Sequence, residues 1–250
     1  MPTQELSGTT ALVTGASRGF GRAIAIALSK HGAYVAGVAR DPGRLAELHA
    51  QLGGAFTPVT ADAADPVVAG QLLDKYRPRT LVLNAGAAPL TRPVHRQTWQ
   101  TFSRNWEVDV QHVFNWTREA LLLPLPPGSV VIAISSGAAV NGSPLSGGYA
   151  GAKATIQFIA SYAADESARN GLGIRFTSVL PQLTPETGLG AAGVAAYAAR
   201  QGVGIPAFLD RLGPALTPEQ VGTAIVDLVT CPGEDQDSYL LTAAGLSPLQ

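Results

Sequence analysis

The sequence predicts an α/β fold: one doubly wound domain in which about seven parallel strands carry helices on both faces. Short apolar runs alternate with segments of helical periodicity, which is typical of strand–helix–strand units around a parallel sheet. The 250 residues, 46% of them hydrophobic, are enough to bury one large core, and the chain shows no internal repeat and no interdomain linker. We therefore expect a single domain over residues 1–250.

The predicted strands are short runs whose apolar character suits burial within a parallel sheet. They cover residues 9–14, 33–39, 55–61, 79–84, 129–135, 174–180 and 238–242. The predicted helices cover residues 20–31, 42–52, 66–76, 97–123, 149–169 and 218–230. Asp41 followed by Pro42 is typical of a helix N-terminus, and Asn170 followed by Gly171 is typical of the turn after a helix. The Gly-, Ala- and Pro-rich residues 183–213 are predicted to form an insertion with short helices.

Composition excludes several classes of function. A net charge of −1 without a Lys/Arg run gives no electrostatic basis for binding nucleic acid or an anionic membrane. Cys231 is the only cysteine, and the four histidines (His31, His49, His95 and His112) lack metal-ligand spacing, so we expect no metal site. The N-terminus lacks a signal-peptide pattern, and no apolar run is long enough to span a bilayer. These observations favour a cytoplasmic protein.

A glycine-rich turn, Gly-x-x-x-Gly-x-Gly, follows the first predicted strand. Glycine lets the backbone turn tightly and approach a ligand, and the free N–H groups of the following helix bind phosphate. This placement predicts a dinucleotide site, with a plain strand–helix connection as the alternative. The cofactor-binding candidates here are Gly15, Ser17, Arg18, Gly19, Phe20 and Gly21.

The end of the second predicted strand indicates which dinucleotide binds. An acid at this position would bind the ribose 2′-OH of NAD, but the chain has Ala39 and Arg40. Arg40 and Arg18 can together bind a 2′-phosphate through charge-assisted hydrogen bonds, so the sequence favours NADP(H) over NAD(H). The alternatives are a solvated Arg40 and an Asp41 that turns inward.

Two further turns complete the predicted cofactor site. Asp62 and Ala63 follow the third strand, where the carboxylate can accept a hydrogen bond from an adenine amino group. The small residues Asn84, Ala85 and Gly86 end the fourth strand and leave space for the adenine ribose. Each segment could equally be an ordinary turn.

The catalytic candidates are Ser136, Tyr149 and Lys153. Tyr149 and Lys153 are four residues apart and therefore share one face of a helix. A nearby ammonium lowers the pKa of a phenol toward working pH, and a hydroxyl at a neighbouring strand end can bind the oxygen that receives the proton. The set is suited to reducing a carbonyl or oxidising an alcohol when a cofactor supplies the hydride. A surface Tyr–Lys pair is the alternative.

In this order and at this spacing, the motifs resemble the short-chain dehydrogenase/reductase family over essentially the whole chain. The resemblance implies a Rossmann-like fold and an NADP-preferring carbonyl reductase acting on a small molecule. It implies that Tyr149 is the general acid in reduction and the base in oxidation, that Lys153 contacts the nicotinamide ribose, and that Ser136 polarises the carbonyl. It also implies a dimer or tetramer formed through helices 97–123 and 149–169. The alternative is a catalytically weak NADP(H)-binding sensor or scaffold.

Two departures from the family pattern concern the site. Asp109 replaces an asparagine that helps to hold a water in the proton relay, and its charge should raise the pKa of Tyr149 and keep Lys153 protonated. The usual Pro-Gly is Pro181-Gln182, and Thr184 and Thr187 compete as the threonine that contacts the carboxamide. We place Gln182, Ala138 and Asn141 at the substrate, beneath a lid formed by residues 183–213.

Overall fold

The computed structural model describes residues 6–231 and 236–249, so the ends of the predicted domain lie outside the described residues. Eight strands form one sheet in the order β3-β2-β1-β4-β5-β6-β7-β8. The strands are β1 (Thr10–Thr14), β2 (Tyr34–Ala39), β3 (Phe56–Thr60), β4 (Thr80–Leu83), β5 (Val130–Ile134), β6 (Arg175–Pro181), β7 (Ser238–Thr242) and β8 (Gly245–Pro248). All pair in parallel except β8, which pairs antiparallel with β7. The predicted fold class is confirmed.

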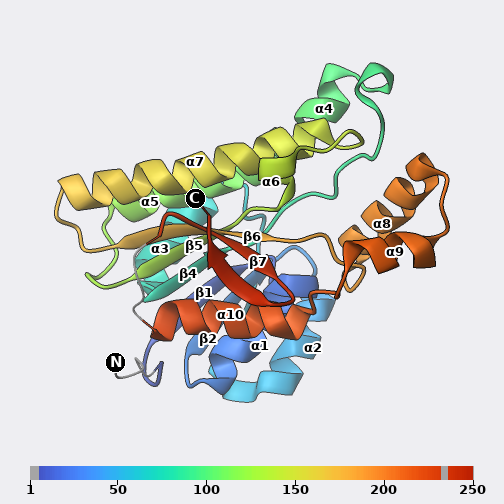
Figure 1. Ribbon diagram of the computed structural model, residues 1–250. Helices are drawn as coiled ribbons and strands as arrows, with labels where there is room; N and C mark the ends of the chain where they lie inside the picture. The colour runs from blue at the N-terminus through green and yellow to red at the C-terminus, as the bar shows by residue number, and fades with distance from the viewer. Residues whose placement is uncertain (1–5, 232–235, 250) are drawn as a thin grey trace.

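Helices cover both faces of the sheet (Figure 1). One face carries α1 (Gly19–Lys30), α2 (Pro42–Leu52) and α10 (Pro218–Thr230), and the other carries α3 (Pro66–Tyr76), α5 (Gln111–Leu122) and α7 (Gly147–Arg169). Successive strand residues point to opposite faces, so Val13 joins the apolar cluster under α1 and Leu12 joins the cluster under α5 and α7. The sheet is therefore buried on both sides, as its continuous apolar strands predict.

The edge strand β8 is absent from the sequence prediction. It has only four residues, begins with glycine and ends with proline, and such residues are depleted in strands. It follows β7 after Ala243 and Ala244, a pair without the Asn-Gly or Asp-Gly signature of a tight hairpin. The pairing with β7 sets the register of β8, and the residues of β8 do not by themselves predict that pairing.

The helical stretch predicted over residues 97–123 is interrupted by a π-helical turn. It consists of α4 (Trp99–Asn105), η3 (Trp106–Val110) and α5. A π-helical turn inserts one extra residue into the helical repeat, and such turns are frequent at functional sites. Here the turn contains Asp109 and directs its side chain into the protein, where 1% of the residue is exposed.

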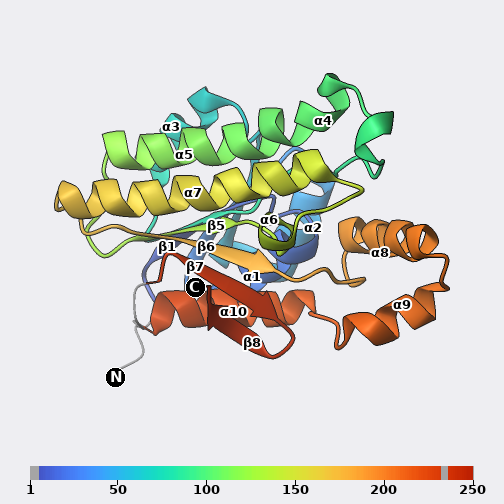
Figure 2. The same ribbon diagram turned by 45° about the horizontal axis from the view of Figure 1, so that its top comes forward.

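Residues 183–213, hereafter the insertion, contain α8 (Gly188–Gln201) and α9 (Ile205–Leu212). Both helices project beyond the end of the sheet (Figure 2). They have a small core of their own, with Val194, Ala198 and Phe208 buried. Across the described residues, no helix has the length and apolar character needed to cross a membrane.

Candidate active site

The carboxyl ends of β1, β4, β5 and β6 carry most of the predicted site residues to one edge of the sheet. Parallel strands place the loops that follow them at the same edge, which is where doubly wound folds bind ligands. The glycine-rich loop follows β1, Asn84 follows β4, Ser136 follows β5 and Gln182 follows β6. The fold therefore brings together segments that are far apart in the sequence.

Hydrogen bonds join the loop after β1 to the loop after β4. Thr14 Oγ1 accepts hydrogen bonds from the N–H groups of Asn84 (2.9 Å) and Ala85 (3.1 Å). Asn84 Nδ2 donates to the carbonyl oxygens of Thr14 (3.1 Å) and Gly15 (3.4 Å). A Cβ on Gly21 would overlap the carbonyl oxygen of Gly15, so only glycine fits there. These residues fix the loop at the sheet edge.

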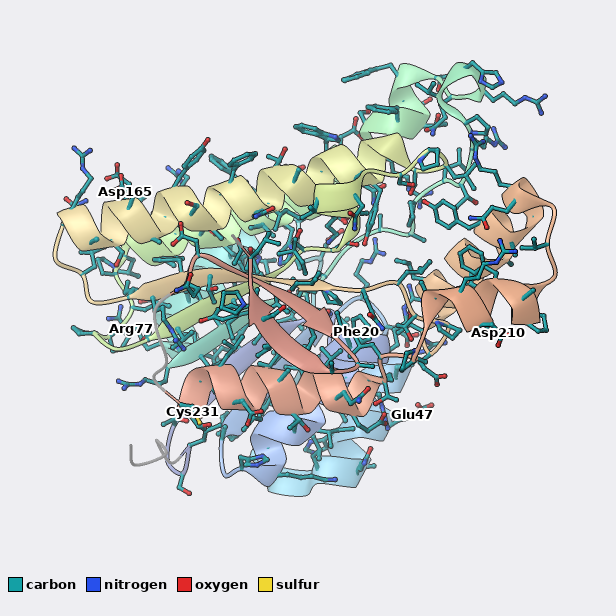
Figure 3. The ribbon with its side chains drawn as sticks, viewed as in Figure 1. Phe20, Glu47, Arg77, Asp165, Asp210 and Cys231 are labelled. Carbon is teal, nitrogen blue, oxygen red and sulfur yellow. The ribbon has the colours of Figure 1, made fainter. Side chains whose placement is uncertain are left out.

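The N-terminus of α1 fits a phosphate group. No side chain caps this helix, because Arg18 at the N-cap is extended and makes no side-chain cap bond. The first N–H groups of an uncapped helix are available to an anion. Ser17 is half-buried beside this turn, and Phe20, labelled in Figure 3, packs partly against the core below α1. The binding of a phosphate group by this helix N-terminus stays a prediction.

The residue that follows β2 is a cation, Arg40, rather than an acid. Arg40 is 72% exposed in its side chain, and its Nη1 lies 4.0 Å from Asp62 Oδ2. Asp41 does not turn inward: its Oδ1 accepts the Arg44 N–H (3.1 Å) as the N-cap of α2, and its Oδ2 pairs with Arg44 Nε (3.4 Å). An exposed arginine held only by a long ion pair can move to a ligand phosphate.

Asp62 and Ala63 lie in a turn that is largely used within the protein. Asp62 Oδ1 accepts the N–H of Ala64 (3.0 Å), and the Ala63 carbonyl accepts from Trp116 Nε1 (2.8 Å). The Trp116 contact anchors the loop after β3 to α5. The contact of both residues with adenine stays a prediction.

Lys153 is the centre of the candidate catalytic group. Its Nζ donates to the Ile134 carbonyl (3.1 Å), lies 3.4 Å from Asp109 Oδ2, and is 5.6 Å from the centre of the Tyr149 ring. Burial alone would lower the pKa of Lys153, but the charges of Asp109 and Tyr149 outweigh it and raise that pKa above its ordinary value. The lysine is therefore a stable cation beside the phenol.

Asp109 joins the π-helical turn to the loop after β4. Its Oδ1 accepts the N–H of Ala87 (2.7 Å), while Asn105 Nδ2 donates to the Ala87 carbonyl (2.8 Å). Its Oδ2 faces Lys153 in an ion pair that is almost fully buried on both sides. In a low-dielectric interior such a pair is strongly coupled, so the aspartate helps to set the charge of the lysine.

The two serines after β5 have different roles. Ser135 is buried, and its Oγ donates to the Lys153 carbonyl (2.7 Å), which ties the strand to α7. Ser136 is half-buried, and its Oγ accepts the N–H of Ala138 (3.2 Å). Among the described residues its hydroxyl proton has no protein acceptor, so Ser136 is the serine able to donate to a ligand.

Two side chains of the segment after β6 are hydrogen-bonded within the protein, and their predicted roles toward substrate and cofactor stay predictions. Gln182 Nε2 donates to the Pro214 carbonyl (2.9 Å), and the buried Thr184 Oγ1 donates to the Leu216 carbonyl (2.7 Å). Both side chains therefore anchor the base of the insertion. Thr187 caps α8, and its Cγ2 lies 3.8 Å from the position that a Cβ would take on Gly19. Of the two competing threonines, Thr187 is the one beside the glycine-rich loop.

The predicted substrate residues Ala138 and Asn141 lie in a short helix, α6 (Ala138–Asn141), to which the sequence analysis assigns no element. Ala138 is half-buried, whereas Asn141 is exposed and donates to the Gly137 carbonyl (3.3 Å). Pro181 at the end of β6 accepts the Gly137 N–H (2.9 Å), which fixes the start of this helix.

Two residues near the site were missed by sequence reasoning. The Tyr197 hydroxyl on α8 hydrogen-bonds Ser143 Oγ, which lies 2.6 Å from Ser146 Oγ, three residues before Tyr149. His112 is buried one helical turn after Asp109, and burial, followed by the charge of Lys153, lowers its pKa to about 3. In the sequence, only the spacing of three residues from Asp109 points to His112. Only its position as the one tyrosine of the Ala-rich helix α8 points to Tyr197.

Known proteins resemble this chain in sequence and in fold. Residues 9–197 match the family model for short chain dehydrogenases. A probable NADP-dependent dehydrogenase from Haemophilus influenzae is 34% identical over 189 residues, which cover 70% of this chain and 71% of the relative. Serine 3-dehydrogenase from Rhizobium radiobacter is 36% identical over 187 residues, covering 70% and 72%. The crystal structure of a 3-ketoacyl-(acyl-carrier-protein) reductase from Brucella melitensis, complexed with NADH, has the same fold, with a TM-score of 0.73 at 24% identity over 90% and 92% of the two chains.

Proposed function

Because the chain belongs to the short-chain dehydrogenase family, we propose that it is an NADP(H)-dependent enzyme that interconverts a carbonyl compound and a secondary alcohol. The observation that carries the proposal is the group formed by Tyr149, Lys153 and Asp109 at the ligand-binding edge of the sheet. Lys153 is a buried cation 5.6 Å from the Tyr149 ring centre and 3.4 Å from Asp109 Oδ2. A cation beside a phenol makes the phenol a usable acid and base.

The cofactor would lie along the edge from β2 to β6. The α1 N-terminus and residues 15–21 would hold the pyrophosphate, Asn84 to Gly86 the adenine ribose, and Asp62 with Ala63 the adenine. Lys153 and Tyr149 would contact the nicotinamide ribose, and Pro181 with Thr184 or Thr187 would border the nicotinamide. When bound, the nicotinamide supplies the hydride.

In reduction, Tyr149 gives its phenolic proton to the substrate oxygen, and in oxidation it takes the proton from the alcohol. Ser136 donates a hydrogen bond to the same oxygen and stabilises the charge that develops there. Lys153 places its positive charge beside the Tyr149 ring, and Asp109 keeps Lys153 protonated. Each role uses an atom that the fold holds at the same edge of the sheet.

Two arginines support the preference for NADP(H), and so does an aspartate whose carboxylate is already bonded within the protein. Arg18 and Arg40 are exposed at the tips of the loops after β1 and β2, and Asp41 is occupied at the start of α2. The similar protein from Haemophilus influenzae is also described as NADP-dependent. Two guanidinium groups match the charge and geometry of a 2′-phosphate.

The substrate would lie between α6 and the insertion, which would act as its lid. Ala138 and Leu145 give this wall a small apolar character that suits a nonionic ketone. Tyr197 already connects the insertion to the loop before Tyr149 through Ser143. A substrate bound there would therefore be covered by α8.

We also propose that the chain forms a dimer or tetramer through α5 and α7. Their outward face exposes large apolar side chains: Phe114 is 52%, Phe158 58% and Tyr162 66% exposed, with Phe158 and Tyr162 stacked on each other. Aromatic residues are enriched in protein interfaces, and an exposed cluster of this kind fits a second copy of the chain.

Turnover of a panel of ketones and secondary alcohols with NADPH or NADP⁺ tests the function. We expect Tyr149→Phe to abolish turnover while NADPH, followed by its fluorescence, still binds. Tyr76→Phe at the end of α3, outside the proposed site and the proposed interface, is the matched control and should retain full activity. Tight NADPH binding without turnover of any compound, unchanged in Tyr149→Phe, would instead support the sensor or scaffold alternative.

A further inference from the structure

The first turn of α7 lacks the side-chain cap that other helices of this chain have. Five described helices begin with an Asp or Thr whose side chain accepts a backbone N–H, and these capping residues have ψ between 100° and 164°. Ser146 holds the same position in α7, but its ψ is 52° and its side chain makes no capping bond. Serine is among the residues preferred at this position, so the absence of the cap requires an explanation.

The turn without a cap carries the proposed catalytic tyrosine. Gly147, Gly148 and Tyr149 are the first three residues of α7, and the third N–H of a helix is a group that a capping serine binds. Two glycines make this turn intrinsically weak. Contact with α4 holds it instead, because a Cβ on Gly148 would lie 2.0 Å from the Phe102 carbonyl oxygen. The backbone at Tyr149 is therefore sensitive to what Ser146 binds.

The hydroxyl group of Ser146 is bonded to a neighbouring serine. Ser146 Oγ lies 2.6 Å from Ser143 Oγ, and the Ser146 N–H donates to the same oxygen (2.9 Å). The Tyr197 hydroxyl of α8 is the third partner of Ser143 Oγ. A hydroxyl has one proton and two acceptor lone pairs, so these three bonds use the full capacity of Ser143. The three hydroxyls form a chain from the insertion to the first turn of α7.

The two ends of this hydroxyl chain belong to parts of the molecule that are held separately. Tyr197 is fixed within the insertion, since its ring stacks on Phe208 (6.4 Å between ring centres, 7° between ring planes) and packs against the core there. The loop that contains Ser143 is held from another side, because the Leu145 carbonyl accepts the Arg92 N–H (2.7 Å). A displacement of the insertion would therefore remove Tyr197 from Ser143 and leave the loop in place.

We propose that Ser143 and Ser146 are positioning residues that transmit the position of the insertion to Tyr149. With the insertion in contact, the Ser146 hydroxyl stays in the chain and the first turn of α7 keeps the backbone of this structure. With the insertion displaced, water reaches the half-buried Ser143 and replaces its protein partners, so Ser146 turns to the ψ of the other caps and accepts the Tyr149 N–H. The inference rests on the proposed function, in which Tyr149 is the acid and base and the insertion is the lid.

Amide hydrogen exchange in protein with ¹⁵N-labelled tyrosine tests the alternative hydrogen bond without turnover, with the Tyr149 signal assigned by Tyr149→Phe. Ser143→Ala frees the Ser146 hydroxyl, so we expect the Tyr149 N–H to exchange about fivefold more slowly than in wild type. Tyr197→Phe should also slow it with both serines present, whereas Ser143→Ala/Ser146→Ala should not. Exchange that is unchanged or faster in either single variant, or equally slow in the double variant, would overturn the proposal.

Ser178→Ala is the matched control. Ser178 Oγ also pairs with a second serine hydroxyl, that of Ser238 at 2.8 Å, but between β6 and β7. The substitution removes a bond of the same kind without changing the loop before α7, so Tyr149 exchange should stay at the wild-type rate. The melting temperature of each variant reports on folding.

Steady-state kinetics test the consequence for catalysis. Ser143→Ala should lower kcat about fivefold as well as raise KM, because Tyr149 must leave the capped setting before it reacts. Loss of a contact that only holds the lid would raise KM alone. Ser143→Thr keeps a hydroxyl and should recover most of the loss. In the Tyr197→Phe background Ser143→Ala should lower kcat little further, and Ser178→Ala should leave kcat unchanged.

The two failures are distinguishable. A rise in KM without any fall in kcat would mean that Tyr197 and Ser143 only hold the insertion, and it would contradict the proposal. Absence of turnover in the wild-type protein would contradict the proposed function, and the exchange measurement would then decide the roles of Ser143 and Ser146 alone.

Discussion

The glycine-rich loop and the insertion lie at the same edge of the sheet but are held in different ways. The loop is fixed by the reciprocal hydrogen bonds between Thr14 and Asn84 and by a turn in which Gly21 touches Gly15. The insertion has only a small core, and the side chains of Gln182 and Thr184 join its two ends by hydrogen bonds to the carbonyl groups of Pro214 and Leu216. One side of the site is therefore preorganised by the fold, whereas the other can move without disturbing the main core.

The largest expected effect comes from a methyl group added at Gly21 of the loop, compared with one added at Gly188 of the insertion, where the surroundings are open. Gly21→Ala should destabilise the protein by about 3 kcal/mol, because the new Cβ would overlap the Gly15 carbonyl oxygen, which is backbone and cannot turn away. Gly188→Ala in α8 is the control, since no atom lies within 4 Å of its added Cβ. Chemical denaturation measures both changes. Similar losses in the two variants would contradict the contrast.

This contrast explains what the sequence could predict. The motif from Gly15 to Gly21 and the motif from Tyr149 to Lys153 are each contained in one turn or one helix, so both can be recognised from neighbouring residues in the sequence. The lowered pKa of His112 depends on its burial and on Lys153, 41 positions away, and the hydrogen bond of Tyr197 depends on Ser143, 54 positions away. Such partners become neighbours only after the sheet forms, and no spacing rule identifies them. The π-helical turn at Asp109 likewise depends on its packing against α7 and the loop after β4.

The preorganised side should also discriminate between cofactors. Arg40→Asp should weaken NADPH binding about 100-fold, or about 2.7 kcal/mol, and leave NADH affinity nearly unchanged, because it replaces a phosphate-binding cation with an anion. Arg44→Asp makes the same charge change four residues away, where the arginine already pairs with Asp41, and serves as the control. Fluorescence titration with each cofactor measures the ratio. Equal weakening of NADPH and NADH would show that Arg40 does not contact the 2′-phosphate.

We expect the buried His112 to make the stability of the folded protein depend on pH in the acidic range. The pKa of His112 is about 3 in the folded protein against an ordinary 6.5, so the unfolded chain binds the proton more readily between these values. Stability therefore rises with pH across this window, and this residue alone should remove about 2 kcal/mol between pH 7 and pH 5. His112→Gln should flatten that part of the stability profile, whereas exposed His95→Gln should not. A profile with the same slope in wild type and His112→Gln would contradict the buried neutral imidazole.

The smallest expected effect concerns the polar contact that connects the insertion to the rest of the site. Tyr197→Phe removes the hydroxyl that bonds Ser143 but keeps the ring, which stacks on Phe208 within the insertion. A single neutral hydrogen bond contributes about 1 kcal/mol, so KM for the substrate should rise about fivefold while melting temperature and NADPH affinity hold. Tyr76→Phe on α3 is the control for loss of a tyrosine hydroxyl. If NADPH affinity fell as much as substrate affinity, Tyr197 would support the preorganised side as well, and the separation of the two regions would fail.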